Sequence, residues 1–213
     1  MPTTAPIAAA ILTGGRGRRL GGVRKAELDV GGATIAARQL PVLRAVSRHV
    51  FAVGAAVGGS GGEEIEYVAD LFPEHGALGG IYTAIVSSPC DRTLVVACDM
   101  PFLDERLLQY MAGIDADLVI PRTARGYEPL CAVYGRACAA SIRERLERGT
   151  LAASVLPAGV SIVEVGPEVL GPYDPDGLLF LNVNTPHDYA RARELSETLS
   201  KRSRDRIMDE LGP

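Results

Sequence analysis

The sequence predicts an α/β protein with three layers, in which helices cover both faces of a mostly parallel sheet. Short apolar runs of strand length alternate along the chain with amphipathic stretches of helical spacing, a pattern typical of strands joined by crossover helices. Residues 93–97 (TLVVA) form a β-branched run without polar alternation, as expected for a strand that is buried on both faces.

Composition and charge fit one globular domain. The chain has 213 residues, of which 47% are hydrophobic and 23% are charged, so it can bury a sizeable core. We expect residues 1–200 to form a single domain and the charge-rich residues 201–213 to form a helix end or tail. The formal net charge of −4 gives no overall field that attracts nucleic acid, so no nucleic-acid partner is expected.

Cysteine spacing and hydropathy indicate a cytoplasmic protein. The four cysteines include no C-x-x-C pair, which argues against a zinc site and fits reduced thiols. No apolar run approaches the ~18 residues of a membrane-spanning helix, and no secretory leader is recognisable. We therefore expect no membrane partner.

An apolar strand over residues 7–13 leads into the most unusual stretch of the chain, residues 11–25 (ILTGGRGRRLGGVRK). Its glycines let backbone N–H groups approach an anion without a Cβ in the way, and its five cations supply compensating charge. The stretch predicts a phosphate-binding loop, with a flexible basic turn as the alternative. Residues 25–30 are expected to follow as a short extended segment, which a turn at Gly31-Gly32 closes.

Apolar side chains at helical spacing predict a helix over residues 34–48, with Thr34 as its N-cap. Pro41 within this run implies a kink or a late helix start. Strands are expected at residues 49–54 and 66–69, on either side of a glycine-rich surface loop.

The second half of the chain continues the alternation of strands and helices. A loop over residues 70–80 is expected to run into a helix at residues 81–87, followed by the buried strand at 93–97. The remaining expected elements are a helix at 104–112, a strand at 117–121, an extended segment at 128–134, a helix at 136–147, strands at 160–165 and 178–183, and a last helix that begins near Thr185-Pro186 with Thr185 as N-cap.

Two familiar phosphate-binding motifs do not fit the glycine-rich loop. A Walker A loop requires G-x-x-x-x-G-K-[ST], but Ala26 follows Lys25 where the hydroxyl residue should stand. The dinucleotide fingerprint G-x-G-x-x-G meets Leu20 in place of its third glycine. The loop therefore belongs to neither class.

Polar residues mark the carboxyl ends of several expected strands. Asp70 and Asp99 each follow a strand, and Asn182 and Asn184 lie at the end of the last one. Ligands of parallel sheets bind at this edge, so we expect one crevice to hold these side chains and the glycine-rich loop.

Asp99 and Lys25 are the candidates for metal and phosphate chemistry. Mg²⁺ takes oxygen ligands and usually one or two carboxylates beside substrate phosphates, which favours Asp99; its alternative role is to cap the helix at 104–112. Lys25 is the sole lysine among the first 200 residues and would neutralise phosphate charge, unless it is a solvated surface cation. The alternatives are a turn-forming role for Asp70 and helix capping for the two asparagines.

The loop resembles the nucleotidyltransferase signature L-x-G-G-x-x-x-R-M-G-x-x-K, with one additional residue before the lysine. The matching residues are Leu12, Gly14, Gly15, Arg19, Gly21 and Lys25. Four further stretches resemble molybdenum cofactor guanylyltransferases in the same order along the chain. They are Asp70 with GALGGI at 76–81, ACDMPFL at 97–103, EPLCAVY at 128–134 and FLNVNTPHDY at 180–189.

This resemblance implies a Rossmann-like nucleotidyltransferase fold of the GT-A type. The implied reaction transfers GMP from GTP to molybdenum-bound molybdopterin, releases pyrophosphate and uses Mg²⁺ as cofactor. The implied partners are GTP and molybdenum-molybdopterin, with transient contacts to the enzymes that supply and receive the cofactor.

The family's site roles transfer to matching positions of this chain. Lys25, Arg19 and Asp99 are the implied catalytic residues, with Asp99 as the metal ligand. The implied nucleotide-binding residues are Leu12, Thr13, Gly14, Gly15, Lys25, Asp70 and Asp99. The backbone of residues 12–14 would face the guanine edge. Asp70 would bind the ribose or the base, or would contact one of the metal's ligands.

Three departures from the family pattern keep other functions open. Ala77 replaces a proline, Arg24 replaces an aspartate before the lysine, and Gly54 stands near where the family often carries an asparagine. One alternative is a sister nucleotidyltransferase that uses CTP with the same pterin, or another nucleotide with a sugar- or polyol-phosphate. The other is a non-catalytic nucleotide-binding paralogue, which Arg24 keeps open. The T-G-G motif at 13–15 and the C-D-M-P motif at 98–101 favour the guanylyl branch, whereas an alanine in place of Gly14 would favour the cytidylyl branch.

Overall fold

The computed structural model describes residues 6–13, 24–54 and 65–211, with side chains described as far as residue 202. Within these residues, eight strands form one sheet in the order β3-β2-β1-β4-β7-β5-β6, and β8 pairs with β5. The strands are β1 (Ile7–Leu12), β2 (His49–Val53), β3 (Glu66–Val68), β4 (Arg92–Ala97), β5 (Leu118–Thr123), β6 (Gly126–Tyr127), β7 (Cys131–Gly135) and β8 (Ile162–Val165).

The sheet is mixed but mostly parallel. β3, β2, β1 and β4 all run parallel, and β8 runs parallel to β5. β7 is inserted antiparallel between β4 and β5, and β6 forms a short antiparallel hairpin with β5. Leu12 of β1 is in register with Val53 of β2 and Ala97 of β4, so three parallel strands end at one level.

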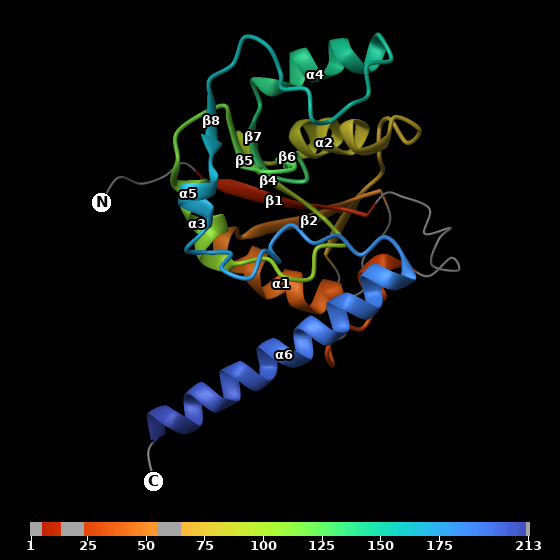
Figure 1. Ribbon diagram of the computed structural model, residues 1–213. Coiled ribbons are helices and arrows are strands. Elements are labelled where there is room, and N and C mark those ends of the chain that lie inside the picture. The colour runs from red at the N-terminus through yellow and green to blue at the C-terminus, as the bar shows by residue number, and fades with distance from the viewer. Residues whose placement is uncertain (1–5, 14–23, 55–64, 212–213) are drawn as a thin grey trace.

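Helices cover both faces of the sheet (Figure 1), which confirms the predicted three layers. α2 and α4 lie on one face and α1 and α3 on the other. The helices are the 3₁₀ turn η2 (Lys25–Glu27), α1 (Ile35–Val46), α2 (Gly76–Ser87), α3 (Glu105–Gly113), α4 (Cys138–Glu147), α5 (Pro167–Leu170) and α6 (Pro186–Leu211).

β1 forms the centre of the core because its alternate residues face opposite helix layers. Ala9 and Ile11 belong to the cluster that packs against α1 and α3. Ala8, Ala10 and Leu12 belong to the cluster that packs against α2 and α4. All six residues of β1 are buried, and the small alanines let both helix layers approach closely.

The predicted caps of two helices are confirmed. The Thr34 hydroxyl accepts a hydrogen bond from the Ala37 N–H, and α1 begins directly after it. α1 passes through Pro41, so a late helix start was the wrong interpretation of that proline. At α6, the Asp188 N–H donates to the Thr185 hydroxyl while the Thr185 N–H donates to the Asp188 carboxylate, a reciprocal cap.

The segment at residues 178–183 is not the strand that its apolar sequence predicts. Four of its residues are buried, but backbone pairing with the sheet does not hold it. The N–H groups of Leu178 and Leu179 donate to the Asp174 carboxylate, and Val183 N–H donates to the Asp99 carbonyl at 2.9 Å. The run is therefore apolar because it is buried where it crosses the ends of the strands, and not because it forms a strand.

Residues 25–30 also differ from the extended segment that was predicted. Lys25–Glu27 form a 3₁₀ turn, with the Leu28 N–H donating to the Lys25 carbonyl. The expected turn at Gly31-Gly32 is present, and both glycines have positive φ. Lys25 thus begins a short helical turn, and Asp29 pairs with Thr34 in an isolated bridge.

α2 begins at Gly76, five residues before the predicted start at Ile81. The low helix propensity of glycine makes this stretch look like a loop. Close packing provides the reason for glycine here, because a Cβ on Gly79 would lie 2.5 Å from the Phe72 carbonyl oxygen. The tertiary contact outweighs the local propensity.

The short α5 and the two-residue strand β6 were not predicted, whereas the other strands and helices, apart from the differences given above, lie within a few residues of their expected positions. Among the described helices, none is at once long enough and apolar enough to cross a membrane.

The packing of α2 can be tested with Gly79→Ala. We expect this substitution to destabilise the fold by about 1–3 kcal/mol, because the new Cβ must displace the backbone at Phe72. Gly113→Ala in α3 is the matched control, since its Cβ would meet nothing within 4 Å. Urea unfolding of both variants measures the difference, and equal stabilities would contradict the close approach of α2 to residue 72.

Candidate active site

A cavity of about 780 Å³ opens at the carboxyl ends of β1, β2 and β4. Leu12, Val53 and Ala97, the in-register strand ends, line it. This size is typical of pockets for small molecules, and its location is the edge where parallel sheets bind ligands. The crevice expected from the sequence is therefore present.

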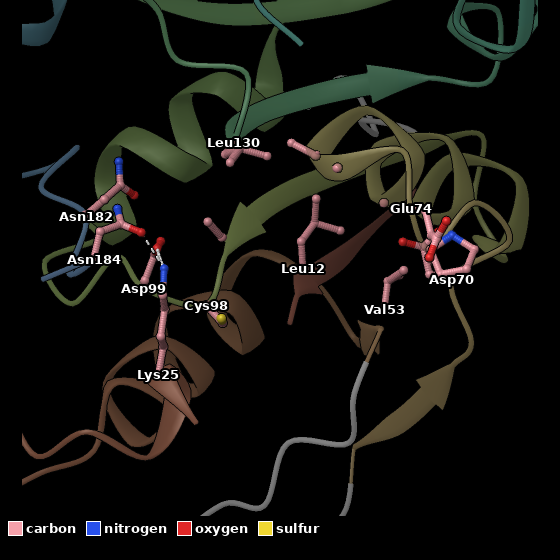
Figure 2. Close-up of a pocket in the computed structure, with 15 residues that line it drawn as sticks. Leu12, Lys25, Val53, Asp70, Glu74, Cys98, Asp99, Leu130, Asn182 and Asn184 are labelled. Atoms are coloured by element: carbon pink, nitrogen blue, oxygen red, sulfur yellow. Dashed lines mark hydrogen bonds and ion pairs between the residues drawn. The ribbon is translucent and has the colours of Figure 1, made fainter. Parts of the chain in front are cut away.

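Lys25, Asp99 and Asn184 meet at one end of this cavity (Figure 2). The Lys25 ammonium donates to Asp99 Oδ2 at 2.8 Å and also donates to Asn184 Oδ1. The Lys25 and Asp99 side chains are only 18% and 12% exposed, so water screens the ion pair poorly. The structure thus joins three residues that the sequence placed in one site.

Each of the three residues is positioned by a different element. Lys25 begins the η2 turn, Asp99 lies in the turn that follows β4, and Asn184 immediately precedes the Thr185 cap of α6. The backbone bond between Val183 and Asp99 holds the last segment against the β4 turn. Asp104, and not Asp99, caps α3. The Asp99 side chain is therefore available to the site.

Two buried oxygen atoms in this region have no hydrogen-bond partner within the part of the chain that the structure describes. They are Oδ1 of Asp99 and Oδ1 of Asn182, and both residues line the cavity. Buried acceptors that are left unpaired are costly and call for a ligand. One carboxylate oxygen and one amide oxygen form a donor set that suits Mg²⁺, which prefers oxygen ligands and completes its shell with water or phosphate.

Asp70 lies on the opposite side of the cavity from Asp99, close to Glu74 (Figure 2). Its Oδ1 accepts hydrogen bonds from the Thr83 hydroxyl and the Phe72 N–H, both at 2.9 Å. The turn-forming role considered for Asp70 is therefore real, and the residue also faces the cavity. Glu74 was not predicted, because an exposed glutamate in a loop carries no signal in sequence.

The residues just before the glycine-rich loop form hydrogen bonds with the end of β2 and with the turn after β4. The Thr13 N–H and hydroxyl both donate to the Val53 carbonyl at 2.8 Å, and the Leu12 carbonyl accepts from the Cys98 N–H. These bonds fix the floor of the cavity. Gly14, Gly15 and Arg19 lie outside the described residues, so their roles stay predictions.

The three departures from the family pattern lie at the edges of this site. Arg24 forms an exposed ion pair with Glu27 at 3.0 Å, which compensates its charge locally. Gly54 has a φ of 107°, a conformation that L side chains rarely adopt, so a glycine is required in this backbone. Ala77 lines the cavity within α2.

Other residues near the cavity are chemically inert or lie further away. Burial, and then the charge of Asp99, raises the pKa of the Cys98 thiol to about 12, so Cys98 stays neutral. Within the EPLCAVY stretch at 128–134, Leu130 lines the cavity. Burial raises the pKa of Glu128, whose carboxylate accepts from the Thr123 hydroxyl and pairs with Arg125 at 3.5 Å.

Known proteins are similar in sequence over most of this chain. A "probable molybdenum cofactor guanylyltransferase" from Pelotomaculum thermopropionicum is 34% identical over 189 residues, which cover 88% of this chain and 92% of the relative. A molybdenum cofactor guanylyltransferase from Desulfosudis oleivorans is 31% identical, covering 85% of this chain and 92% of the relative.

Solved structures and a family model agree with these relatives. The crystal structure of molybdopterin-guanine dinucleotide biosynthesis protein A from Archaeoglobus fulgidus matches with a TM-score of 0.71 and 26% identity, over 90% of this chain and 99% of that one. The family model for the MobA-like NTP transferase domain matches residues 9–160. The chain therefore belongs to the MobA-like NTP transferase family.

Proposed function

We propose that the protein transfers GMP from GTP to molybdenum-bound molybdopterin and releases pyrophosphate. The observation that carries the proposal is the meeting of Lys25, Asp99 and Asn184 at one end of a cavity of about 780 Å³. Relatives that are named molybdenum cofactor guanylyltransferases and share nearly the whole chain support the choice of nucleotide and acceptor.

Lys25 would bind the triphosphate and stabilise the departing pyrophosphate. An ammonium group has three N–H donors, and Asp99 and Asn184 accept from two of them, which leaves a third for a phosphate oxygen. Two anions must approach each other in this reaction, so positioned positive charge lowers the barrier. Arg19, in the glycine-rich loop, would assist.

Mg²⁺ would be held by Asp99 together with the amide oxygen of Asn182. Among the described residues at this end of the cavity, Lys25 and Asp99 cancel each other's charge, so a triphosphate calls for additional positive charge, which Mg²⁺ and Arg19 would supply. Bound there, Mg²⁺ would polarise phosphate oxygens. No general base is needed, because the acceptor phosphate is itself an anionic nucleophile.

The nucleotide and the acceptor would occupy different parts of the cavity. Asp70 and the backbone of residues 12–14 would hold the nucleoside, and Leu130 and Asn182 lie where the acceptor would enter. Transient contacts with the enzymes that supply and receive the cofactor, and a cytoplasmic location, complete the proposal.

Nucleotide choice is the direct test of this function. With molybdenum-loaded pterin and Mg²⁺, we expect pyrophosphate to be released from GTP and much less from CTP or ATP. Release from CTP in place of GTP would identify a cytidylyltransferase. Binding of GTP without pyrophosphate from any acceptor, sugar phosphates included, would identify a nucleotide-binding paralogue.

Asp99→Asn tests the metal ligand. The substitution removes the carboxylate charge and keeps the shape, so we expect turnover to fall by roughly 100-fold or more while the fold persists. Asp104→Asn is the matched control, because asparagine also caps a helix well and Asp104 caps α3 without lining this cavity. Equal steady-state rates for the two variants would contradict the assignment.

Lys25→Met separates the catalytic role of the lysine from its structural one. Its loss leaves the poorly exposed Asp99 carboxylate without a counter-charge, so we expect a destabilisation of about 1–3 kcal/mol together with a loss of turnover. Adding Asp99→Asn should restore the stability but not the turnover. Urea unfolding and pyrophosphate release measure the two effects, and an unrestored stability in the double variant would argue against the ion pair.

A further inference from the structure

Gln39 is a buried polar residue of α1 that lies beneath the turn carrying Asp99. The side chain is 1% exposed. Its Nε2 donates to the Ala97 carbonyl at 2.7 Å and to the Met100 carbonyl at 3.0 Å. These two carbonyls stand on either side of Cys98 and Asp99, so a single amide group ties both ends of the turn.

The Gln39 amide satisfies two backbone carbonyls, which stabilises the fold, and it also fixes the geometry of the turn between them. The other end of the group, Gln39 Oε1, is buried and has no hydrogen-bond partner among the described residues. An apolar side chain of similar volume would avoid the cost of this unpaired oxygen, but it would leave the Ala97 and Met100 carbonyls without their donor. What the amide provides and an apolar residue cannot is the pair of hydrogen bonds to the turn.

The turn that Gln39 holds determines where the Asp99 carboxylate lies. Asp99 lines the cavity with its Oδ2 at 2.8 Å from the Lys25 ammonium and its Oδ1 buried. Small displacements of a metal-binding carboxylate lower the rate of the reaction. Residues that hold such a metal ligand in place typically affect metal affinity or activity by about 10–100-fold.

We propose that Gln39 is a positioning residue of the transferase site, which fixes the Ala97–Met100 turn so that Asp99 can bind a divalent cation beside Lys25. The inference rests on the proposed function for its catalytic consequence. The two hydrogen bonds alone support the structural part of the inference, which is that the position of Asp99 depends on the Gln39 amide.

Ser47, the residue directly after α1, offers a matched control. Its hydroxyl is also buried, at 4% exposure, and donates to a strand carbonyl, that of Ile7, at 2.7 Å. Ile7 is the first residue of β1, at the opposite end of the strand from the cavity. Ser47→Ala therefore removes hydrogen bonds between the end of α1 and the backbone of β1 and β2, including those to His49, without touching the Asp99 turn.

The experiment compares Gln39→Met with Ser47→Ala in two readouts. The first is turnover in the pyrophosphate assay, and the second is the factor by which Mg²⁺ raises GTP affinity in calorimetric titrations. For Gln39→Met we expect turnover and the Mg²⁺ factor each to fall about 10–100-fold, with GTP affinity in EDTA unchanged. For Ser47→Ala we expect only a lower unfolding midpoint.

A double variant separates positioning from general destabilisation. In an Asp99→Asn background, Gln39→Met should cause no further loss of turnover or of the Mg²⁺ factor, because the group it positions is gone. An undiminished loss in that background, or equal behaviour of Gln39→Met and Ser47→Ala, would overturn the inference.

A further variant and the wild-type protein keep the test decisive. Should Gln39→Met fail to fold, Gln39→Glu takes its place, because glutamate has the same volume. A protonated glutamate has one O–H and can donate to only one of the two carbonyls. We therefore expect a partial loss of turnover and of the Mg²⁺ factor. A wild-type protein that releases no pyrophosphate, yet binds GTP more tightly with Mg²⁺, would overturn the transferase function while the calorimetric comparison still decides the role of Gln39.

Discussion

The ion pair between Lys25 and Asp99 is the interaction on which the site depends. Lys25 is separated by 74 residues from Asp99 and by 159 residues from Asn184, the second acceptor of its ammonium. Removing two charges from water is costly unless geometry is good and the remaining donors are satisfied. The pair therefore requires that the η2 turn, the end of β4 and the start of α6 all reach their places, and it makes the site a property of the whole fold.

The regular part of the sheet is what makes such accuracy attainable. β1, β2 and β4 end in register, so the backbone that carries Asp99 starts from a fixed level. The antiparallel β7 covers the outer edge of β4 and pairs with it over five residues, so β4 is held on both sides. A carboxylate two residues beyond such a strand needs only a short turn to be positioned, and this turn is where additional hydrogen bonds matter.

Prediction from the sequence succeeded where local pattern and burial agree. The buried run at 93–97 and the caps at Thr34 and Thr185 required no tertiary information, and the strand-end rule correctly placed Asp99 at the cavity. The two asparagines reach the same cavity although the strand predicted before them does not form. It failed where tertiary contacts override local preference. The stretch at 178–183 is apolar because it is buried across the strand ends, and the start of α2 is glycine-rich because Phe72 approaches it.

The residues that sequence reasoning missed share one physical property: their importance lies in what the fold places beside them. Glu74 is an ordinary loop glutamate until the fold brings it to the cavity next to Asp70. Gln39 resembles any polar residue of an amphipathic helix until α1 packs under the β4 turn. No periodicity or motif marks such residues in a single sequence.

α1 links both members of the ion pair, and this gives the helix a role beyond covering the sheet. Its first residue, Ile35, donates its N–H to the Leu28 carbonyl at 3.0 Å and so anchors the η2 turn that begins with Lys25. One turn further on, Gln39 holds the turn of Asp99. A shift of α1 would move the ammonium and the carboxylate together, so the distance between them is better protected than either position. The helix acts as a common base for the two charges on which the proposed chemistry depends.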